Sequence, residues 1–245
     1  MTNAPQPFYR RPLWVIVAIF LAVVLVGGGI AAVVGAVNGN RNTADPTPSR
    51  SASSTSDSVP ASAKSTCGLK GYETTSSLTA APKAKWDLVG TIAAPSDPKG
   101  TGPGVTSSDG VRSCYSHTAE GALYAIVNYY AQATDARLLP HIADLVAPGE
   151  GKDAALKKAA GDSADASTTR LQVAGFKVNN YSTSEATIDV VWTVTSEDNT
   201  LVSMPMVMKW VDGDWKVEVT ASGDFPFTAS AVQSLGGYTP WAAGV

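Results

Sequence analysis

The longest apolar run of the chain covers residues 13–37 and carries no charged side chain. As a helix, this run would be roughly 37 Å long, against a hydrocarbon core of about 30 Å. A cleaved signal peptide is the alternative, but its apolar region is about 7 to 15 residues long and ends near a small-residue cleavage site. Ala36 is a weak candidate for such a site. The pattern favours one transmembrane helix at 13–37, preceded by a short tail at 1–12.

The chain becomes polar after this run. Residues 38–66 are rich in Ser, Thr, Ala, Asn and Pro, and they include no aromatic side chain. A segment of this composition has too little apolar surface to fold. We therefore predict a disordered linker at 38–66, with an r.m.s. span of roughly 30 Å as a flexible coil. A folded domain is expected at 67–220.

The first part of this domain, residues 67–117, is rich in turn-forming residues. Short strands are expected at 86–92 and at 111–115. The intervening residues 94–110 hold three prolines and four glycines, too many for regular structure, so we predict a loop there.

Helical spacing of apolar residues begins after Thr118, a residue type favoured as an N-cap. The spacing predicts a helix at 119–133. A second helical stretch is expected at 135–146, where Pro140 would bend or start it. A short third helix is expected at 152–160.

The hydrophobic period then changes from 3.6 to 2, as is typical of strands. Four strands are predicted, at 171–178, 186–195, 201–211 and 214–220. The pair Asp212-Gly213 is typical of a two-residue hairpin turn. In that register Trp210 lies opposite Trp215 on an apolar face. Pro205 cannot donate to a ladder, so we expect a bulge or a sheet edge there.

Residues 221–245 show little pattern, so we expect an irregular C-terminal tail that packs Trp241 loosely or not at all. The chain as a whole predicts an α+β fold. Two or three helices would pack on a four-stranded antiparallel meander, behind one transmembrane helix and a disordered stalk.

Helices followed by a meander that ends in a Trp-Val-Asp-Gly-Asp-Trp-Lys-Val hairpin resemble the cone-shaped nuclear-transport-factor-two-like and ketosteroid-isomerase-like domains. This resemblance covers 118–220, and its most specific segment is the hairpin at 209–219. With one N-terminal membrane helix, the layout is similar to assembly components of type IV secretion and Gram-positive conjugation machines. It is also similar to uncharacterised actinobacterial membrane proteins linked to mobile elements. The resemblance implies a non-enzymatic scaffold that associates with itself and with other channel subunits.

The charge distribution predicts the topology. Arg10 and Arg11 directly precede the apolar run, which favours a cytoplasmic N-terminus and an extracytoplasmic domain. Apart from these two arginines, the chain has 16 basic and 21 acidic residues, a net charge of −5. Such a surface does not attract phosphates, so no direct nucleic-acid partner is expected.

The two cysteines, Cys67 and Cys114, both lie in the part of the chain placed outside the membrane. Oxidation is favoured there, so we predict one disulfide between them. The alternative is a free nucleophilic thiol at Cys114, since His117 follows three residues later.

The sequence contains only two histidines, and it lacks zinc-ligand spacing, a phosphate-binding loop and a nucleophile elbow. We therefore expect no metal and no cofactor.

The predicted inward positions of the strands are all apolar, which argues against acid–base catalysis. A register shift of one residue would bring Asp189 inward. Core packing is the simpler interpretation of the inward aromatic residues, but an open cone would have an apolar pocket. Its candidate residues are Ile126, Tyr130, Trp192, Met208, Trp210 and Trp215.

Three functions follow from these observations. The leading one is a non-enzymatic membrane-anchored scaffold of the cell envelope, plausibly in a conjugation-type channel, that associates with itself and with other envelope proteins. The second is an extracytoplasmic domain that binds a small ligand or the cell wall through the apolar cone. The third is an isomerase-type or dehydratase-type enzyme, which requires a buried carboxylate or histidine that the inward positions lack.

Overall fold

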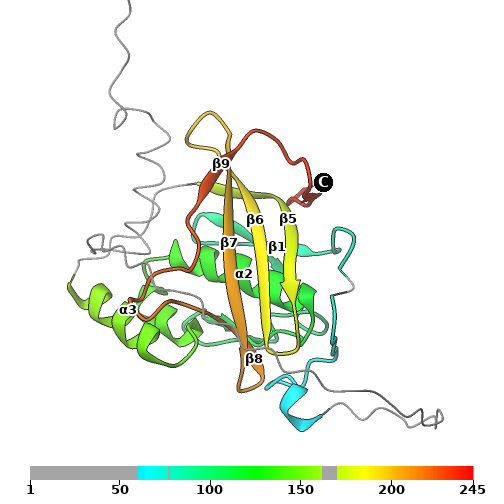
Figure 1. Cartoon of the computed structure of the whole chain (residues 1–245), viewed down its shortest axis with the longest axis vertical. Coiled ribbons are helices and arrows are strands. Elements are labelled where there is room, and N and C mark those ends of the chain that lie inside the picture. The colour runs from blue at the N-terminus through cyan, green and yellow to red at the C-terminus, as the bar shows by residue number, and fades with distance from the viewer. Residues whose placement is uncertain (1–59, 77, 162–169, 245) are drawn as a thin grey trace, which may run out of the picture.

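The computed structural model describes residues 60–76, 78–161 and 170–244, which form an α+β domain (Figure 1). The predicted cytoplasmic tail, transmembrane helix and most of the linker, with Arg10 and Arg11, lie outside these residues. Within the described ranges, no helix combines the length and the hydropathy needed to cross a membrane.

The predicted meander is confirmed. Its four antiparallel strands are β5 (Leu171–Tyr181), β6 (Glu185–Val194), β7 (Thr200–Val211) and β8 (Asp214–Val217). Trp210 lies opposite Trp215, as the hairpin signal predicted. Asp212 and Gly213 both have positive φ, at 52° and 80°, the backbone that a tight two-residue hairpin turn requires.

Pro205 lies at a sheet edge, as expected. The outer edge of β7 pairs with β8 through residues 208–211 and with β9 (Ser230–Val232) through residues 201–203. Pro205 falls between these two partners, and its pairing with β6 continues without a bulge. A residue without an N–H group thus lies where no ladder partner requires one.

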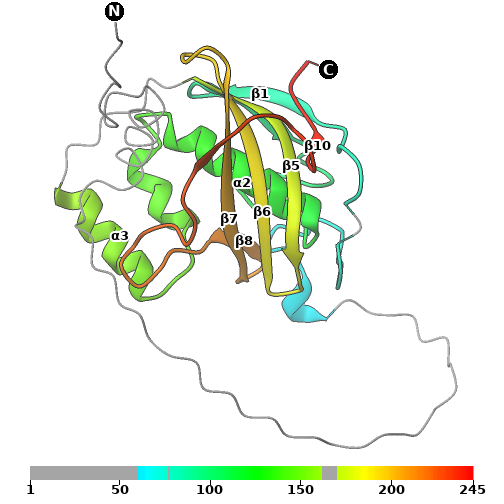
Figure 2. The ribbon, with the colours of Figure 1, turned by 45° about the horizontal axis from the view of Figure 1, so that its top comes forward.

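The helix α2 (Ala119–Ala133) is the centre of the domain and confirms its prediction. Thr118 caps it, since its hydroxyl accepts a hydrogen bond of 3.0 Å from the Gly121 N–H. Every residue of α2 except Glu120 is buried. The meander covers one side of this helix, and the N-terminal part of the domain covers the other (Figure 2).

Two buried polar side chains of α2 hold this N-terminal part in place. Gln132 binds the backbone of Arg112 twice, accepting from its N–H at 2.7 Å and donating to its carbonyl at 3.1 Å. Asn128 donates to the Pro95 carbonyl at 3.0 Å. Because both side chains are at most 1% exposed, the backbone groups that they bind belong to the core of the domain.

The prediction of one strand at 86–92 is wrong. The chain forms a hairpin of β1 (Lys85–Val89) and β2 (Ile92–Ser96), which turns at Gly90 with φ of 55°. The predicted loop at 94–110 therefore starts later. It also contains β3 (Val105–Thr106), which pairs with β4 (Arg112–Ser113).

The remaining helices differ from the predictions in type or in length. The stretch expected at 135–146 is a 3-10 helix, η3 (Leu139–Leu145), with Pro140 in its first turn, where a missing N–H costs nothing. The third predicted helix is α3 (Glu150–Gly161). A short 3-10 helix, η2 (Ala61–Ala63), precedes the predicted start of the domain.

The expectation of a loosely packed tail is wrong. After β9, the chain crosses the outer face of the sheet and pairs with β5 as β10 (Thr239–Pro240) (Figure 2). Trp241 is only 5% exposed and donates to the Pro82 carbonyl at 2.9 Å. Its ring contacts Trp86, Tyr124 and Phe176. Short strands and one anchoring side chain produce no sequence period, so the pattern missed this segment.

Replacing Trp241 with Ala should lower the free energy of unfolding by about 3 to 5 kcal/mol, because it removes a buried indole and leaves a cavity. Phe227→Ala is the control, since Phe227 lies in the same segment but is 45% exposed. Its effect should stay within about 0.5 kcal/mol. Denaturant unfolding measures both, and equal effects would mean that Trp241 does not anchor the segment.

Candidate functional site

The candidate pocket residues separate into two groups. Ile126, Tyr130, Trp192, Met208 and Trp215 belong to one packed hydrophobic core. Burial raises the pKa of the Tyr130 hydroxyl far above its ordinary value, so this group stays neutral. Trp210 is half-buried and lies at the end of the sheet, where it contributes to a pocket of about 610 Å³.

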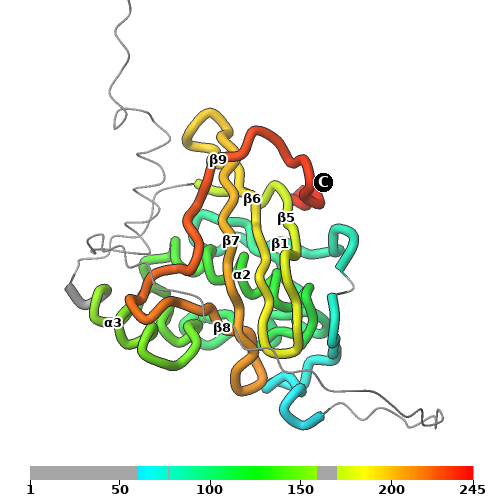
Figure 3. The backbone as a smooth tube through the Cα atoms, viewed as in Figure 1, coloured from blue at the N-terminus to red at the C-terminus, as the bar shows by residue number. Residues whose placement is uncertain are grey.

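This pocket lies where the chain enters the domain. We call residues 60–66 the N-terminal strap, because they run along the turn of the β7–β8 hairpin (Figure 3). The predicted boundary at Cys67 is therefore too late. Ala63 is 4% exposed and Ser65 is 6% exposed, so part of the predicted linker belongs to the folded domain.

Five attachments hold the strap and the residue after it, and four of them involve Ser62, Ala63, Thr66 and Cys67. The Trp210 indole donates to the Ser62 carbonyl at 3.0 Å, and His117 Nδ1 lies 2.9 Å from the Ala63 carbonyl. The Thr66 N–H donates to the Gly213 carbonyl at 2.8 Å. The fourth attachment is the predicted disulfide, Cys67–Cys114, which is confirmed and leaves no free thiol among the described residues.

His117 lies at the centre of this site and is 2% exposed. Its Nε2 atom lies 2.6 Å from the carbonyl of Thr183, in the β5–β6 turn. The Trp210 ring stacks on it with 3.8 Å between the centroids and 5° between the planes. The rings of Tyr72 and Trp215 meet it at steep angles, at 5.2 and 5.6 Å. The imidazole, which lies just before α2, therefore contacts the strap, the β5–β6 turn and the strands β7 and β8.

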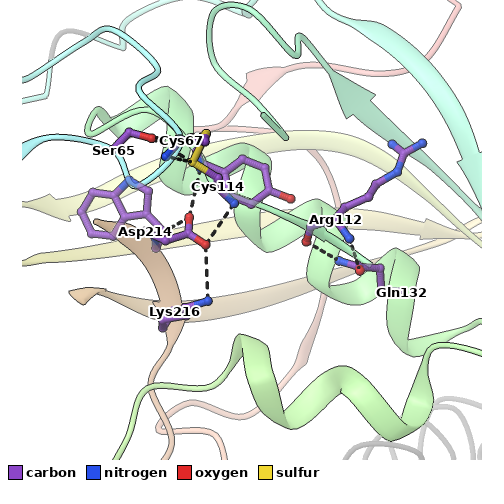
Figure 4. Close-up of polar contacts among 9 residues, drawn as sticks. Ser65, Cys67, Arg112, Cys114, Gln132, Asp214 and Lys216 are labelled. Carbon is purple, nitrogen blue, oxygen red and sulfur yellow. Dashed lines mark hydrogen bonds and ion pairs between the residues drawn. A yellow bond between two sulfur atoms is a disulfide. The ribbon is translucent and has the colours of Figure 1, made fainter. Parts of the chain in front are cut away.

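Asp214 holds the other half of the site together (Figure 4). Its buried carboxylate accepts from the N–H groups of Cys114 and Tyr115, each at 3.0 Å, and from Lys216 Nζ at 3.3 Å. Cys114 has a φ of 65°, a conformation that residues other than glycine rarely adopt. The Asp214 carboxylate compensates the conformational cost of this positive φ, since the N–H groups of two neighbouring residues point toward one anion.

The disulfide also has a polar neighbour. Ser65 Oγ lies 2.9 Å from Cys114 Sγ. A disulfide sulfur carries no hydrogen, so the serine hydroxyl is the donor. The backbone N–H of Cys67 also points at Cys114 Sγ, at 3.1 Å. The strap thus hydrogen-bonds to the disulfide through Ser65, which is the fifth attachment, and the covalent link follows at Cys67.

Asp189 lies on the face of the sheet opposite α2, so the predicted register of β6 and β7 is correct. Ser203 Oγ lies 2.8 Å from both of its carboxylate oxygens, and the Tyr238 hydroxyl donates to Oδ2 at 2.7 Å. Asp189 is 6% exposed. This carboxylate fastens the C-terminal segment across the sheet.

A second pocket, of about 450 Å³, lies near the N-terminus of α2. Glu73 and Glu120 both line it, but Glu73 accepts from the Ala119 N–H at 3.0 Å and Glu120 accepts from the Thr101 hydroxyl at 2.9 Å. Across the described residues, no three His, Cys, Asp or Glu side chains are close enough to hold a metal ion.

Sequence reasoning missed most of this site. It considered His117 only as a partner for a Cys114 thiol, and it did not single out Asp214. The second aspartate of the Asp-Gly-Asp turn was the available signal, because it is buried and a buried carboxylate requires hydrogen-bond donors.

Residues 46–240 match the protein family described as a domain of unknown function (DUF8175). The chain belongs to this family. No curated protein and no solved structure matches it. The range of the DUF8175 match includes the whole strap and extends through β10. Both segments that the sequence pattern assigned to a linker or tail therefore lie within the family's domain.

Asp214→Asn should lower the free energy of unfolding by about 2 kcal/mol, because an amide replaces one acceptor oxygen beneath buried N–H donors. Asp212→Asn is matched to it, since it removes the same charge from the same hairpin at an exposed position with positive φ. Asparagine tolerates that conformation, so the control should change stability by less than about 0.5 kcal/mol. Thermal unfolding of both variants tests the role of Asp214, and equal losses would contradict it.

Proposed function

We propose that this protein is a membrane-anchored, non-enzymatic scaffold of the cell envelope, whose domain lies outside the cell membrane. Its partners would be further copies of itself and other envelope proteins. A conjugation-type transfer channel is the assembly that the resemblance implies. In this proposal the domain has the cone-shaped form of the nuclear-transport-factor-two-like group.

The attachment of the N-terminal strap is the observation that carries the proposal. A tether from a membrane helix would reach the domain through residues 60–66. One covalent bond, one backbone hydrogen bond and three side-chain contacts connect residues 62–67 to the domain. A pull along the tether would be shared among these attachments, so the tether would leave the domain at a fixed point. A domain that stays folded under such a pull suits an assembly component.

The state of the buried ionisable groups also supports a non-enzymatic role. The ring nitrogens of His117 lie against backbone carbonyls, and Asp214 accepts from backbone N–H groups. Asp189 accepts from Ser203 and Tyr238. Each group thus holds its own chain together, whereas a catalytic acid or base must reach a substrate.

The edge strand β1 supports a role in assembly. Among the described residues, β1 pairs only with β2, so its other edge is without a strand partner. Leu88 on this strand is 77% exposed. An unpaired edge with an exposed apolar side chain is a typical site for the addition of a strand from another chain.

The topology can be tested with cysteine variants of the full-length protein and a membrane-impermeant maleimide. Leu88→Cys should be labelled in intact cells, because Leu88 is exposed on a domain that we place outside. Asn3→Cys, in the predicted cytoplasmic tail, should be labelled only after lysis. The reverse pattern would overturn the membrane-anchored scaffold.

Assembly can be tested with two differently tagged copies of the full chain, each carrying a photo-crosslinking residue at Leu88. Cross-linked products should contain both tags or a defined envelope protein. Asp109, on the exposed β3–β4 turn, is the control position, since it is a charged turn residue outside β1. Recovery of monomer alone from both positions would contradict the scaffold.

The alternative function is binding of a small ligand or of cell-wall material. The half-buried Trp210 and the pocket of about 610 Å³ beside it favour this alternative, since ligand sites combine an apolar wall with a few polar groups. Binding of cell-wall fragments that is lost in Trp210→Ala, together with monomer alone in the cross-linking experiment, would favour it over the scaffold.

A further inference from the structure

The two ring nitrogens of His117 have the same kind of neighbour. Nδ1 lies 2.9 Å from the Ala63 carbonyl oxygen, and Nε2 lies 2.6 Å from the Thr183 carbonyl oxygen. A carbonyl oxygen only accepts hydrogen bonds. A neutral imidazole has one N–H group and one lone pair, so it can satisfy only one of these oxygens. The doubly protonated ring donates to both.

The stacked Trp210 ring favours the same charge state. Its indole lies parallel to the imidazole at 3.8 Å, and the face of an indole carries the negative part of its quadrupole. A cation over this face is stabilised, most strongly where water is excluded. His117 is 2% exposed. Burial by itself disfavours a charge, so the indole face and the two carbonyl contacts have to offset this cost.

We propose that His117 is a buried imidazolium that locks the N-terminal strap onto the domain, and that loss of its proton releases the strap. Deprotonation would turn one of the two contacts into a repulsion between lone pairs. It would also remove the cation from the face of Trp210, whose N–H holds Ser62. Two of the five attachments thus depend on one proton.

The other three attachments determine how far the release extends. The Thr66–Gly213 hydrogen bond, the Cys67–Cys114 disulfide and the contact of Ser65 with this disulfide do not involve the imidazole. Residues 60–64 would therefore detach while Cys67 stays in place. The outcome is a change in the length and stiffness of the tether, while the core remains folded. Release of the strap does not depend on what the domain binds, whereas its effect on a membrane tether rests on the proposed function.

Other ionisable groups lie on the elements around the ring. Glu185 pairs with Lys209 at 2.7 Å, and Asp214 pairs with Lys216. The Glu73 carboxylate accepts from the Ala119 N–H, and the Tyr181 hydroxyl donates to the backbone carbonyl of His117. The groups on these elements are Lys64, Tyr72, Glu73, Tyr181, Glu185, Lys209, Asp212, Asp214 and Lys216. None is of a type that ordinarily changes charge between about pH 5 and 8, whereas histidine does.

The ring is buried, but it borders a pocket that water can enter. His117, Lys64 and Asp212 all line the pocket of about 610 Å³ beneath the strap. A proton can therefore leave through this pocket without unfolding of the core. The folded and released strap would exchange on the timescale of a local opening.

The test uses the full-length chain in detergent micelles with the variant His141→Gln, which leaves His117 as the only histidine. Nitrogen NMR of the ring should show two protonated nitrogens at about pH 5 and a lone-pair nitrogen only where the strap is released. Hydrogen exchange at the Ala63 and Lys64 amides, which hydrogen-bond within the strap, reports the release. Their protection, corrected for intrinsic exchange, should fall about tenfold between about pH 5 and 8.

His117→Gln is the matched variant, because its amide can donate to one carbonyl but cannot titrate. In this variant, protection of the strap should not depend on pH, whereas His141→Gln should keep the dependence of the natural sequence. A single protonated ring nitrogen with a fully protected strap at about pH 5 would overturn the proposal. Identical pH profiles in the two variants would also overturn it. If His117→Gln does not fold, the ring spectrum of His141→Gln decides.

Discussion

The enclosure of helix α2 is the constraint on which the rest of the structure depends. An amphipathic helix needs one cover, but α2 is buried on all sides except at Glu120. The meander supplies one cover, and the N-terminal hairpins supply the other. Asn128 and Gln132 bind the backbone of these hairpins from within the core, where an unpaired polar group is expensive. The N-terminal part of the chain must therefore fold together with the sheet.

This requirement explains why both ends of the domain are fastened. The N-terminal part reaches α2 only if the chain before it is fixed, and the disulfide, His117 and Asp214 fix it at one end of the sheet. The C-terminal segment closes the opposite edge, where Trp241 fills the space between β1, α2 and β5. Asp189 holds that segment from the middle of the sheet. Two buried carboxylates and one buried histidine thus join segments distant in sequence.

The sequence predicted those elements whose stability is local. Helix α2 has a cap and a helical period, and the β7–β8 hairpin has a turn that fixes its register, so both were found with their facing residues. The strap and the C-terminal segment were missed, because each is held by a few side chains far away in the sequence. The single strand predicted at 86–92 failed for a related reason, since one glycine turn divides it. The candidate pocket residues were recognised as inward, but spacing alone does not distinguish a filled core from an open one.

The site where the chain enters the domain combines two kinds of attachment with different chemical sensitivity. The disulfide and the backbone hydrogen bond at Thr66 do not change with protonation near neutral pH. In our proposal the contacts of His117 do change, because the neutral ring has one N–H group and the charged ring has two. A tether held only by the first kind would be fixed, and one held only by the second would detach completely. Their combination keeps the domain attached at Cys67 while the residues before it can change state. For a scaffold, this arrangement would alter the reach and orientation of the domain without altering its fold. The hydrogen bonds of Asp214 to Cys114 and Tyr115 do not involve His117, so they would remain when the strap detaches.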